Sequence, residues 1–139
     1  MLLDYVLGLP KQAPHRLDRL PVACQAHFIA FVMDGEVVNG GFNQFWFNNP
    51  DFAAVAADAL EFLEMPDAAD LARQASSIFE TVRDRHAAAR QNGSIEAFMA
   101  TYEGSPFKAV DEAYWRRESE WRDARIRYIR QHVESFVHV

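Results

Sequence analysis

Carboxylate and amide side chains near the middle of the sequence have types and a spacing that could support chemistry. Glu36, Asn39, Gln44 and Asn48 occur within one aromatic-rich stretch. A carboxylate and three amides among aromatic rings could line the pocket of an enzyme that acts on a small molecule or depends on a metal. The same groups could satisfy polar backbone atoms where two helices meet, and we favour this structural interpretation.

Residues that usually bind metals or attack substrates form no recognisable pattern. The 5 histidines are scattered, and neither Glu-x-x-His nor a histidine pair occurs at helical spacing. Glu61 and Glu64 are one turn apart, but the apolar residues of their segment fall on the opposite side, which indicates a solvated surface. Cys24 lies in an apolar stretch with His27 three residues later, which is typical of a structural thiol. We therefore expect no catalytic residue, no metal and no cofactor.

Charge is unevenly distributed along the chain. The 20 acidic and 14 basic residues give a formal net charge of -6, which disfavours direct binding to nucleic acid or to anionic membranes. Between residues 20 and 72 there are eight acids and no Lys or Arg, although an even spread would place about five bases there. This stretch predicts an acidic face that binds a basic protein surface. The face is centred on Asp51, Asp58, Glu61, Glu64, Asp67 and Asp70.

Arginines are frequent between residues 116 and 130, where they are interspersed with aromatic residues. Such a pattern could stack on single-stranded nucleic acid. The same stretch also contains Glu118, Glu120 and Asp123, which can pair with the arginines along a helix. We therefore interpret this stretch as a salt-bridged helix surface.

Apolar residues recur at helical spacing in every long segment, and none alternates as a strand would. Helices are predicted at about 21–38, 51–65, 66–92, 94–102, 106–115 and from about 119 onward, with a short aromatic helix at 42–47. Asn39-Gly40-Gly41 and Asn48-Asn49-Pro50 are predicted breaks. Pro66 and Pro106 suit first helical positions, and Ser94 suits an N-cap. The last two helices could also be one kinked helix.

These elements predict an all-α fold, a compact bundle of about six to seven helices in a single domain that spans residues 1–139. The first residues lack the basic region of a signal peptide, and no apolar run approaches the about 20 residues that cross a membrane. With one cysteine and therefore no internal disulfide, the chain is expected to be cytoplasmic.

The segment from Asp34 to Asn48 resembles the signature of the DNA-mimic protein family, a bacterial domain family of unknown general function. The signature has a Glu-Val-x-Asn-Gly-Gly-Phe core followed by Gln-Phe. The residues that match it are Glu36, Val37, Asn39, Gly40, Gly41, Phe42, Gln44 and Phe45. The resemblance implies an all-helical domain without known catalytic residues. For the best-known member, it implies surface carboxylates that are arranged like DNA phosphates and occupy the site of a DNA-binding protein.

Together, charge and resemblance predict a non-enzymatic acidic protein-interaction module. Its expected partner is a basic protein surface, such as that of a DNA-binding protein or transcription regulator, with no direct contact to nucleic acid or membrane. A homodimer could form through Phe62 and Met65, which fall toward the acidic side of their predicted helix. The alternative is the enzyme that would use Glu36, Asn39, Gln44 and Asn48.

Overall fold

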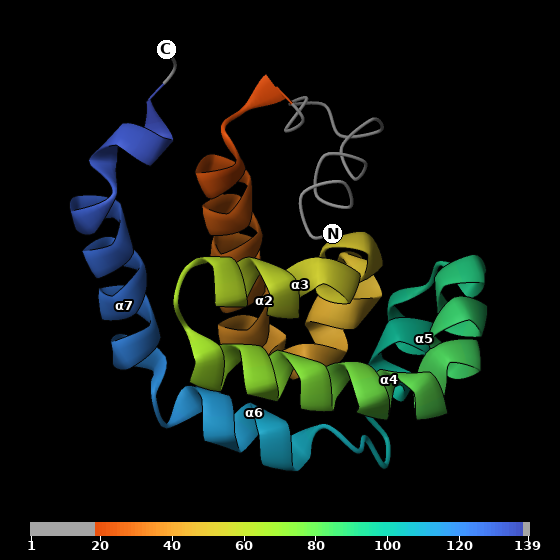
Figure 1. The fold of residues 1–139 in the computed structure, drawn as a ribbon. Coiled ribbons are helices and arrows are strands. Elements are labelled where there is room, and N and C mark those ends of the chain that lie inside the picture. Colours follow the sequence, from red (N-terminus) through yellow and green to blue (C-terminus); the bar gives the residue numbers. More distant parts are fainter. Residues whose placement is uncertain (1–18, 138–139) are drawn as a thin grey trace.

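The structure, a computed structural model, describes residues 19–137 (Figure 1). Within this range the chain forms α2 (Val22–Asn48), α3 (Pro50–Phe62), α4 (Pro66–Asn92), α5 (Ile95–Ala100), α6 (Lys108–Trp115), α7 (Glu118–Gln131) and the 3-10 helix η3 (Val133–Phe136). No strand occurs among the described residues, so the predicted all-α class is confirmed. No helix in this range has the length and apolar character that crossing a membrane requires.

α2 is the central element, and the other helices are arranged around it. Figure 1 shows α3 and α4 in front of its lower half, α6 below α4, and α7 standing alongside α2. α2 packs most extensively on α3, and α3 in turn packs on α4. The buried residues of α2 fall on several of its sides, as is typical of a helix that is covered by others.

A kink divides α2 at Gly40 and Gly41. Gly41 has φ 72° and ψ -178°, a backbone conformation that only glycine adopts without strain. A Cβ atom at Gly41 would also overlap with the carboxylate of Asp111 on α6. The predicted break is therefore a kink between two helical halves, and the aromatic residues after it, Phe42, Phe45 and Trp46, are buried.

Local sequence signals account for most of the other helix ends. α3 and α4 each begin with a proline in the first turn, where the missing N–H is not needed. α4 ends at Gly93, which has φ 76°, and Ser94 caps α5 by accepting a 3.1 Å hydrogen bond from the Ala97 N–H. Arg116 and Arg117 separate α6 from α7, so these are two adjoining helices.

The start of α6 differs from the prediction. α6 begins at Lys108, two residues later than the predicted start at Pro106. Ser105 Oγ instead accepts a 3.4 Å hydrogen bond from the Phe107 N–H, which makes a turn before the helix. A local Ser-Pro pair cannot distinguish a turn from a helical first turn, because both use the same proline φ.

The expected exposure of Met65 is wrong. α3 ends at Phe62, and the chain turns at Glu64, which has φ 60°. The Met65 N–H then bonds back to the Leu60 carbonyl at 2.9 Å, so Met65 leaves the helical wheel of α3 and is only 4% exposed. Phe62 is half-buried, with its ring 6.2 Å from that of Tyr128. These two residues do not form an exposed patch.

Candidate functional site

The six predicted acidic residues lie on two helices that pack against each other and on the turn between them. Asp51, Asp58 and Glu61 are on α3, Glu64 is in the turn, and Asp67 and Asp70 are at the start of α4. All six are exposed. The fold therefore presents the predicted acidic residues to solvent from adjoining elements.

Arginines from outside the base-free stretch neutralise half of this set. Arg73 on α4 contacts Glu61 at 2.9 Å and Asp70 at 3.0 Å. Arg117, at the start of α7, contacts Asp67 at 3.0 Å. The stretch without bases in the sequence is thus not free of bases in space, because one arginine follows it directly and another folds back from 50 residues away.

The other half is the three-acid set, Asp51, Asp58 and Glu64, which forms no ion pair with any residue of 19–137. Asp51 also lies in the first turn of α3, where the positive end of the helix dipole stabilises a negative charge. These three acids are therefore the ones without a direct ion pair among the described residues, and Arg83 and Arg90 line the same surface hollow as Asp51.

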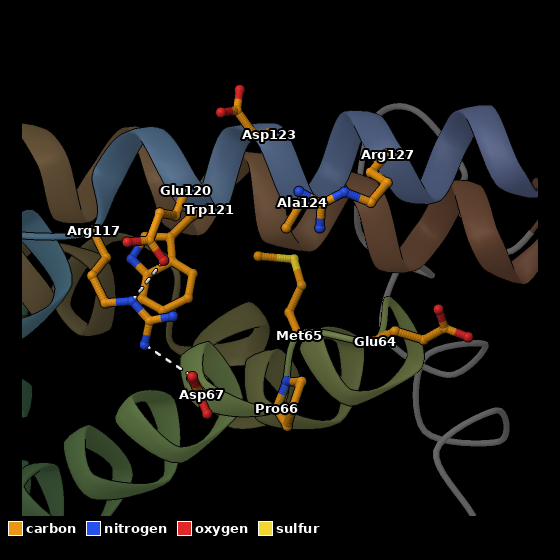
Figure 2. Close-up of a pocket in the computed structure, with 10 residues that line it drawn as sticks. All are labelled: Glu64, Met65, Pro66, Asp67, Arg117, Glu120, Trp121, Asp123, Ala124 and Arg127. Atoms are coloured by element: carbon orange, nitrogen blue, oxygen red, sulfur yellow. Dashed lines mark hydrogen bonds and ion pairs between the residues drawn. The ribbon is translucent and has the colours of Figure 1, made fainter.

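A cavity of about 240 Å³ borders the acidic face, between the α3–α4 turn and α7. Figure 2 shows Arg117 between Asp67 and Glu120, with Trp121 and Met65 lining the interior. The Arg117 guanidinium lies 4.2 Å from the centre of the Trp121 ring and is 2.9 Å from Glu120. On this wall of the cavity, Arg117 is already paired with two carboxylates. Because Asp67 is on α4 and Glu120 is on α7, these ion pairs link the two helices.

A second polar cluster surrounds the α2 kink and contains the four residues of the alternative enzyme site. Glu36 accepts hydrogen bonds from the amides of Gln44, Asn48 and Asn49 at 2.8, 3.0 and 3.2 Å. Gln44 in turn accepts from Asn39 at 3.2 Å. The structure thus brings Glu36, Asn39, Gln44 and Asn48 together, and they bond mainly to one another across the kink.

A buried network that the sequence did not reveal joins α2 to α6 and α7. Asp34 accepts a 2.7 Å hydrogen bond from the Tyr114 hydroxyl and lies 3.4 Å from Arg125. Burial and the charge of Asp34 raise the pKa of Tyr114, which keeps the phenol protonated as a donor. One signal in the sequence could have identified this network. Asp34 is a single charged residue that directly follows an apolar stretch of α2, and a charge in that position usually needs a buried partner.

Asp111 is the second carboxylate that the sequence did not reveal. Its Oδ1 accepts a 2.7 Å hydrogen bond from the Phe42 N–H, directly after the kink. Burial raises the pKa of Asp111 to about 6, and the hydrogen bond from Phe42 opposes this shift. The Tyr102 hydroxyl donates to the Gly40 carbonyl at 2.8 Å, so two segments far along the chain fix the kink.

His86 and Cys24 have environments that suit structural roles. The Nε2 atom of His86 lies 2.8 Å from the Asn43 side-chain oxygen, and burial lowers the pKa of His86 to about 4, so the ring is a neutral donor. Burial raises the pKa of the Cys24 thiol, which disfavours the nucleophilic thiolate. Across residues 19–137, no three His, Cys, Asp or Glu side chains are grouped to hold a metal ion.

Comparison with known protein families gives a match over most of the chain. The family model described as DMP19-like protein matches residues 18–132. This range includes α2 to α7 and thus both the kink cluster and the acidic face. No curated protein and no solved structure matches the chain.

Proposed function

The chain belongs to the DMP19-like protein family, and on this premise we propose that it is a non-enzymatic DNA mimic that binds the basic surface of a DNA-binding protein. The partner's lysines and arginines would contact carboxylates in place of DNA phosphates. Such basic surfaces depend on charge for most of their affinity for DNA, so an exposed acidic surface can compete for them.

The three-acid set is the observation that carries this proposal. Asp51, Asp58 and Glu64 are exposed, and none has an ion-pair partner among residues 19–137. A basic partner can therefore approach them without first breaking an ion pair that the structure shows. Asp51 and Asp58 lie about two turns apart on α3 and Glu64 lies in the turn that follows, so the negative charge is spread over this surface and not confined to one point.

The ion-paired acids support the same surface more weakly. Glu61, Asp67 and Asp70 have side chains that are 44%, 62% and 64% exposed, and exposed ion pairs contribute little free energy. An arginine of the partner can replace Arg73 or Arg117 at these carboxylates. We expect this exchange to add less affinity than contact with the three-acid set.

The test is capture of DNA-binding proteins from a bacterial lysate by the full chain, followed by competition with DNA. We expect a captured protein to be released as salt is raised and to lose its own DNA site when the chain is added. The variant with Asp51→Asn, Asp58→Asn and Glu64→Gln should compete much less effectively.

A charge-matched variant separates specific contact from net charge. Glu61→Gln, Asp67→Asn and Asp70→Asn remove the same three charges, but from acids that already have arginine partners. We expect this control to lose less affinity than the first variant. A captured protein that binds the chain and DNA at the same time would contradict DNA mimicry, as would binding that neither salt nor the first variant weakens.

For the polar cluster at the α2 kink, which consists of Glu36, Asn39, Gln44 and Asn48, we propose a structural role. The mutual hydrogen bonds of Glu36, Gln44 and Asn48 support it, because they leave few polar groups of the cluster for a ligand. Glu36→Gln should then lower the melting temperature of the protein alone. A ligand or metal that raises the melting temperature of the wild type but not of Glu36→Gln would instead favour the enzyme.

A further inference from the structure

An exposed apolar surface lies on a side of α2 that the other described helices leave open. Phe31 is 60% exposed and Val38 is 38% exposed, and Gly35 between them is also exposed. These three residues are spaced at i, i+4 and i+7, so they follow one side of the helix. Trp115 of α6 extends this surface, because it is 42% exposed and its indole N–H donates to the Val37 carbonyl at 2.7 Å. We call Phe31, Gly35, Val38 and Trp115 the α2 patch.

The surroundings of the α2 patch favour an apolar occupant. Phe28 and Val32, which are half-buried on the same side of α2, continue the apolar surface toward the start of the helix. Arg125 lies at one edge, with its guanidinium 6.0 Å from the centre of the Phe31 ring, but this group is already paired with a buried carboxylate. A Cβ atom at Gly35 would meet no atom within 4 Å, so there is room above the helix backbone. Contiguous exposed apolar side chains of this kind usually mark a surface that another apolar element covers.

The sequence before residue 19 contains a segment of matching chemistry. Five apolar residues of this segment recur at a spacing that predicts a helix with one apolar side. They are Leu2, Leu3, Val6, Leu7 and Leu9. By the same spacing Asp4 and Gly8 fall on the opposite side, and Pro10 suits the end of the segment. Residues 2–9 lie outside the described range, so this pattern is a prediction from the sequence.

The segment and the α2 patch agree in length, and the chain between them is long enough. At the helical rise of about 1.5 Å per residue, the ends of residues 2–9 are separated by about 10 Å, as are Phe31 and Val38. The chain enters α2 at Pro21, and the far end of the patch lies about 25 Å further along the helix by the same measure. Residues 10–20 can extend over about 36 Å, so the segment can reach the whole patch. Because it is tethered, its effective concentration there is on the order of millimolar.

We propose that residues 2–9 bind the α2 patch of the same chain through their apolar side. Val6 lies over Gly35 in this arrangement, where the backbone of α2 is open to close approach, and Asp4 faces water. Removal of apolar side chains of both segments from water drives the contact. The segment thereby closes a surface that would otherwise attract other apolar partners. The contact does not involve the three-acid set, so it is independent of the proposed function.

Quenching of tryptophan fluorescence by acrylamide reports whether the α2 patch is covered. The chain has 3 tryptophans, and Trp46 and Trp121 are each 4% exposed. Trp115, which belongs to the patch, therefore accounts for most of the quenching. We expect Trp115 to be shielded in the full chain and to become accessible when the segment is released.

Two full-length variants apply this measurement. Leu3→Asp with Val6→Asp places charges on the apolar side of the segment, and burying them against the α2 patch would be costly. We expect the quenching constant of this variant to be at least about twofold higher than that of the wild type. Asp4→Asn changes the opposite side of the segment and serves as the matched control, with quenching like that of the wild type. Equal quenching in the double variant and the wild type would overturn the proposal.

Disulfide trapping identifies the occupant of the patch. In a Cys24→Ser background, Val6→Cys with Gly35→Cys should form a disulfide within one chain on mild oxidation, because Gly35 has open space for the new side chain. Val6→Cys with Gln91→Cys is the control, since Gln91 is exposed on α4, and its disulfide should form at least about tenfold more slowly. Equal rates in the two pairs would overturn the proposal. A disulfide that joins two chains would also overturn it, because the occupant would then be a second copy.

Discussion

The carboxylates near the α2 kink and those on α3 have the same chemistry but opposite surroundings. Asp34 and Asp111 accept hydrogen bonds from segments far along the chain, and Glu36 accepts them from amides across the kink. Asp51 and Asp58 project into solvent from α3, with no ion pair among the described residues. A carboxylate of the first kind stabilises the fold, whereas one of the second kind adds negative potential that a partner can use.

This difference indicates how a charged surface can change while the fold is kept. The kink residues fix the course of α2, and α2 leads directly into α3 at Pro50. The acidic residues of α3 occupy the side opposite its buried residues and make few demands on packing. Substitution near the kink should therefore alter stability, and substitution on α3 should alter binding.

The largest expected effect is that of Asp34→Ala. The Arg125 side chain is only 9% exposed, and removal of Asp34 would leave its charge buried without a partner. We expect a loss of about 3–5 kcal/mol of unfolding free energy, measured by urea denaturation. Asp58→Ala on α3 should change the same quantity by less than about 0.5 kcal/mol. Equal losses in the two variants would refute the division between the two regions.

Gly41→Ala should have the next largest effect. It combines a positive φ with an overlap between the new Cβ and the Asp111 carboxylate, and we expect a loss of about 2–4 kcal/mol. Gly93→Ala is the control, since Gly93 has φ 76° but open space around it, and it should cost about 1–2 kcal/mol. Similar losses at both glycines would mean that Asp111 does not restrict the kink.

A pH dependence should follow from Asp111. Its pKa is raised from 3.8 to about 6 in the folded protein, so the folded state retains this proton while the unfolded chain releases it. The contribution of protonated Asp111 to the unfolding free energy is therefore fully present below about pH 4 and is lost as pH rises toward about 6. Asp111→Asn keeps an oxygen for the Phe42 N–H and should lack this loss. Urea denaturation at several pH values would measure the difference between the two proteins.

His86 makes the unfolding free energy depend on pH in the opposite direction, and it does so equally in the wild type and in Asp111→Asn. Its pKa is lowered from 6.5 to about 4, so its contribution to stability is lost as pH falls from about 6.5 toward 4. The contribution of His86 therefore cancels when the unfolding free energy of the wild type is subtracted from that of Asp111→Asn. That difference should grow in favour of the variant from pH 4 to about 6 and then level off. A constant difference would contradict the raised pKa of Asp111.

The smallest effect on stability is expected for Arg73→Ala, which releases Glu61 and Asp70. The loss of two exposed ion pairs should cost about 1 kcal/mol or less of unfolding free energy. Affinity for an arginine-rich peptide, measured by calorimetric titration, should rise by about threefold because the acidic face gains two available carboxylates. Arg116→Ala removes the same charge from an exposed arginine that forms no ion pair among residues 19–137, and it serves as the control. An equal gain in both variants would indicate net charge alone.

Helix positions were largely predictable because their signals are local. Pro50 and Pro66 open helices and Gly93 closes one, since backbone preferences depend on a residue and its near neighbours. The kink at Gly40 and Gly41 was located for the same reason. The start of α6 was predicted wrongly because a hydrogen bond within a turn delays the helix. Met65 was wrongly predicted to be exposed, because the chain reverses at Glu64 and takes Met65 off α3.

The sequence by itself determined the all-α class, the helix breaks and the position of the acidic residues along the chain. Only the tertiary structure decided which of those acids are neutralised. Asp67 meets Arg117 from 50 residues away. The structure also revealed Asp111, which was not among the predicted acids and accepts a hydrogen bond from the Phe42 N–H 69 residues away. Such pairings depend on how distant helices pack, and the periodicity of one segment carries no information on which residue of another will face it.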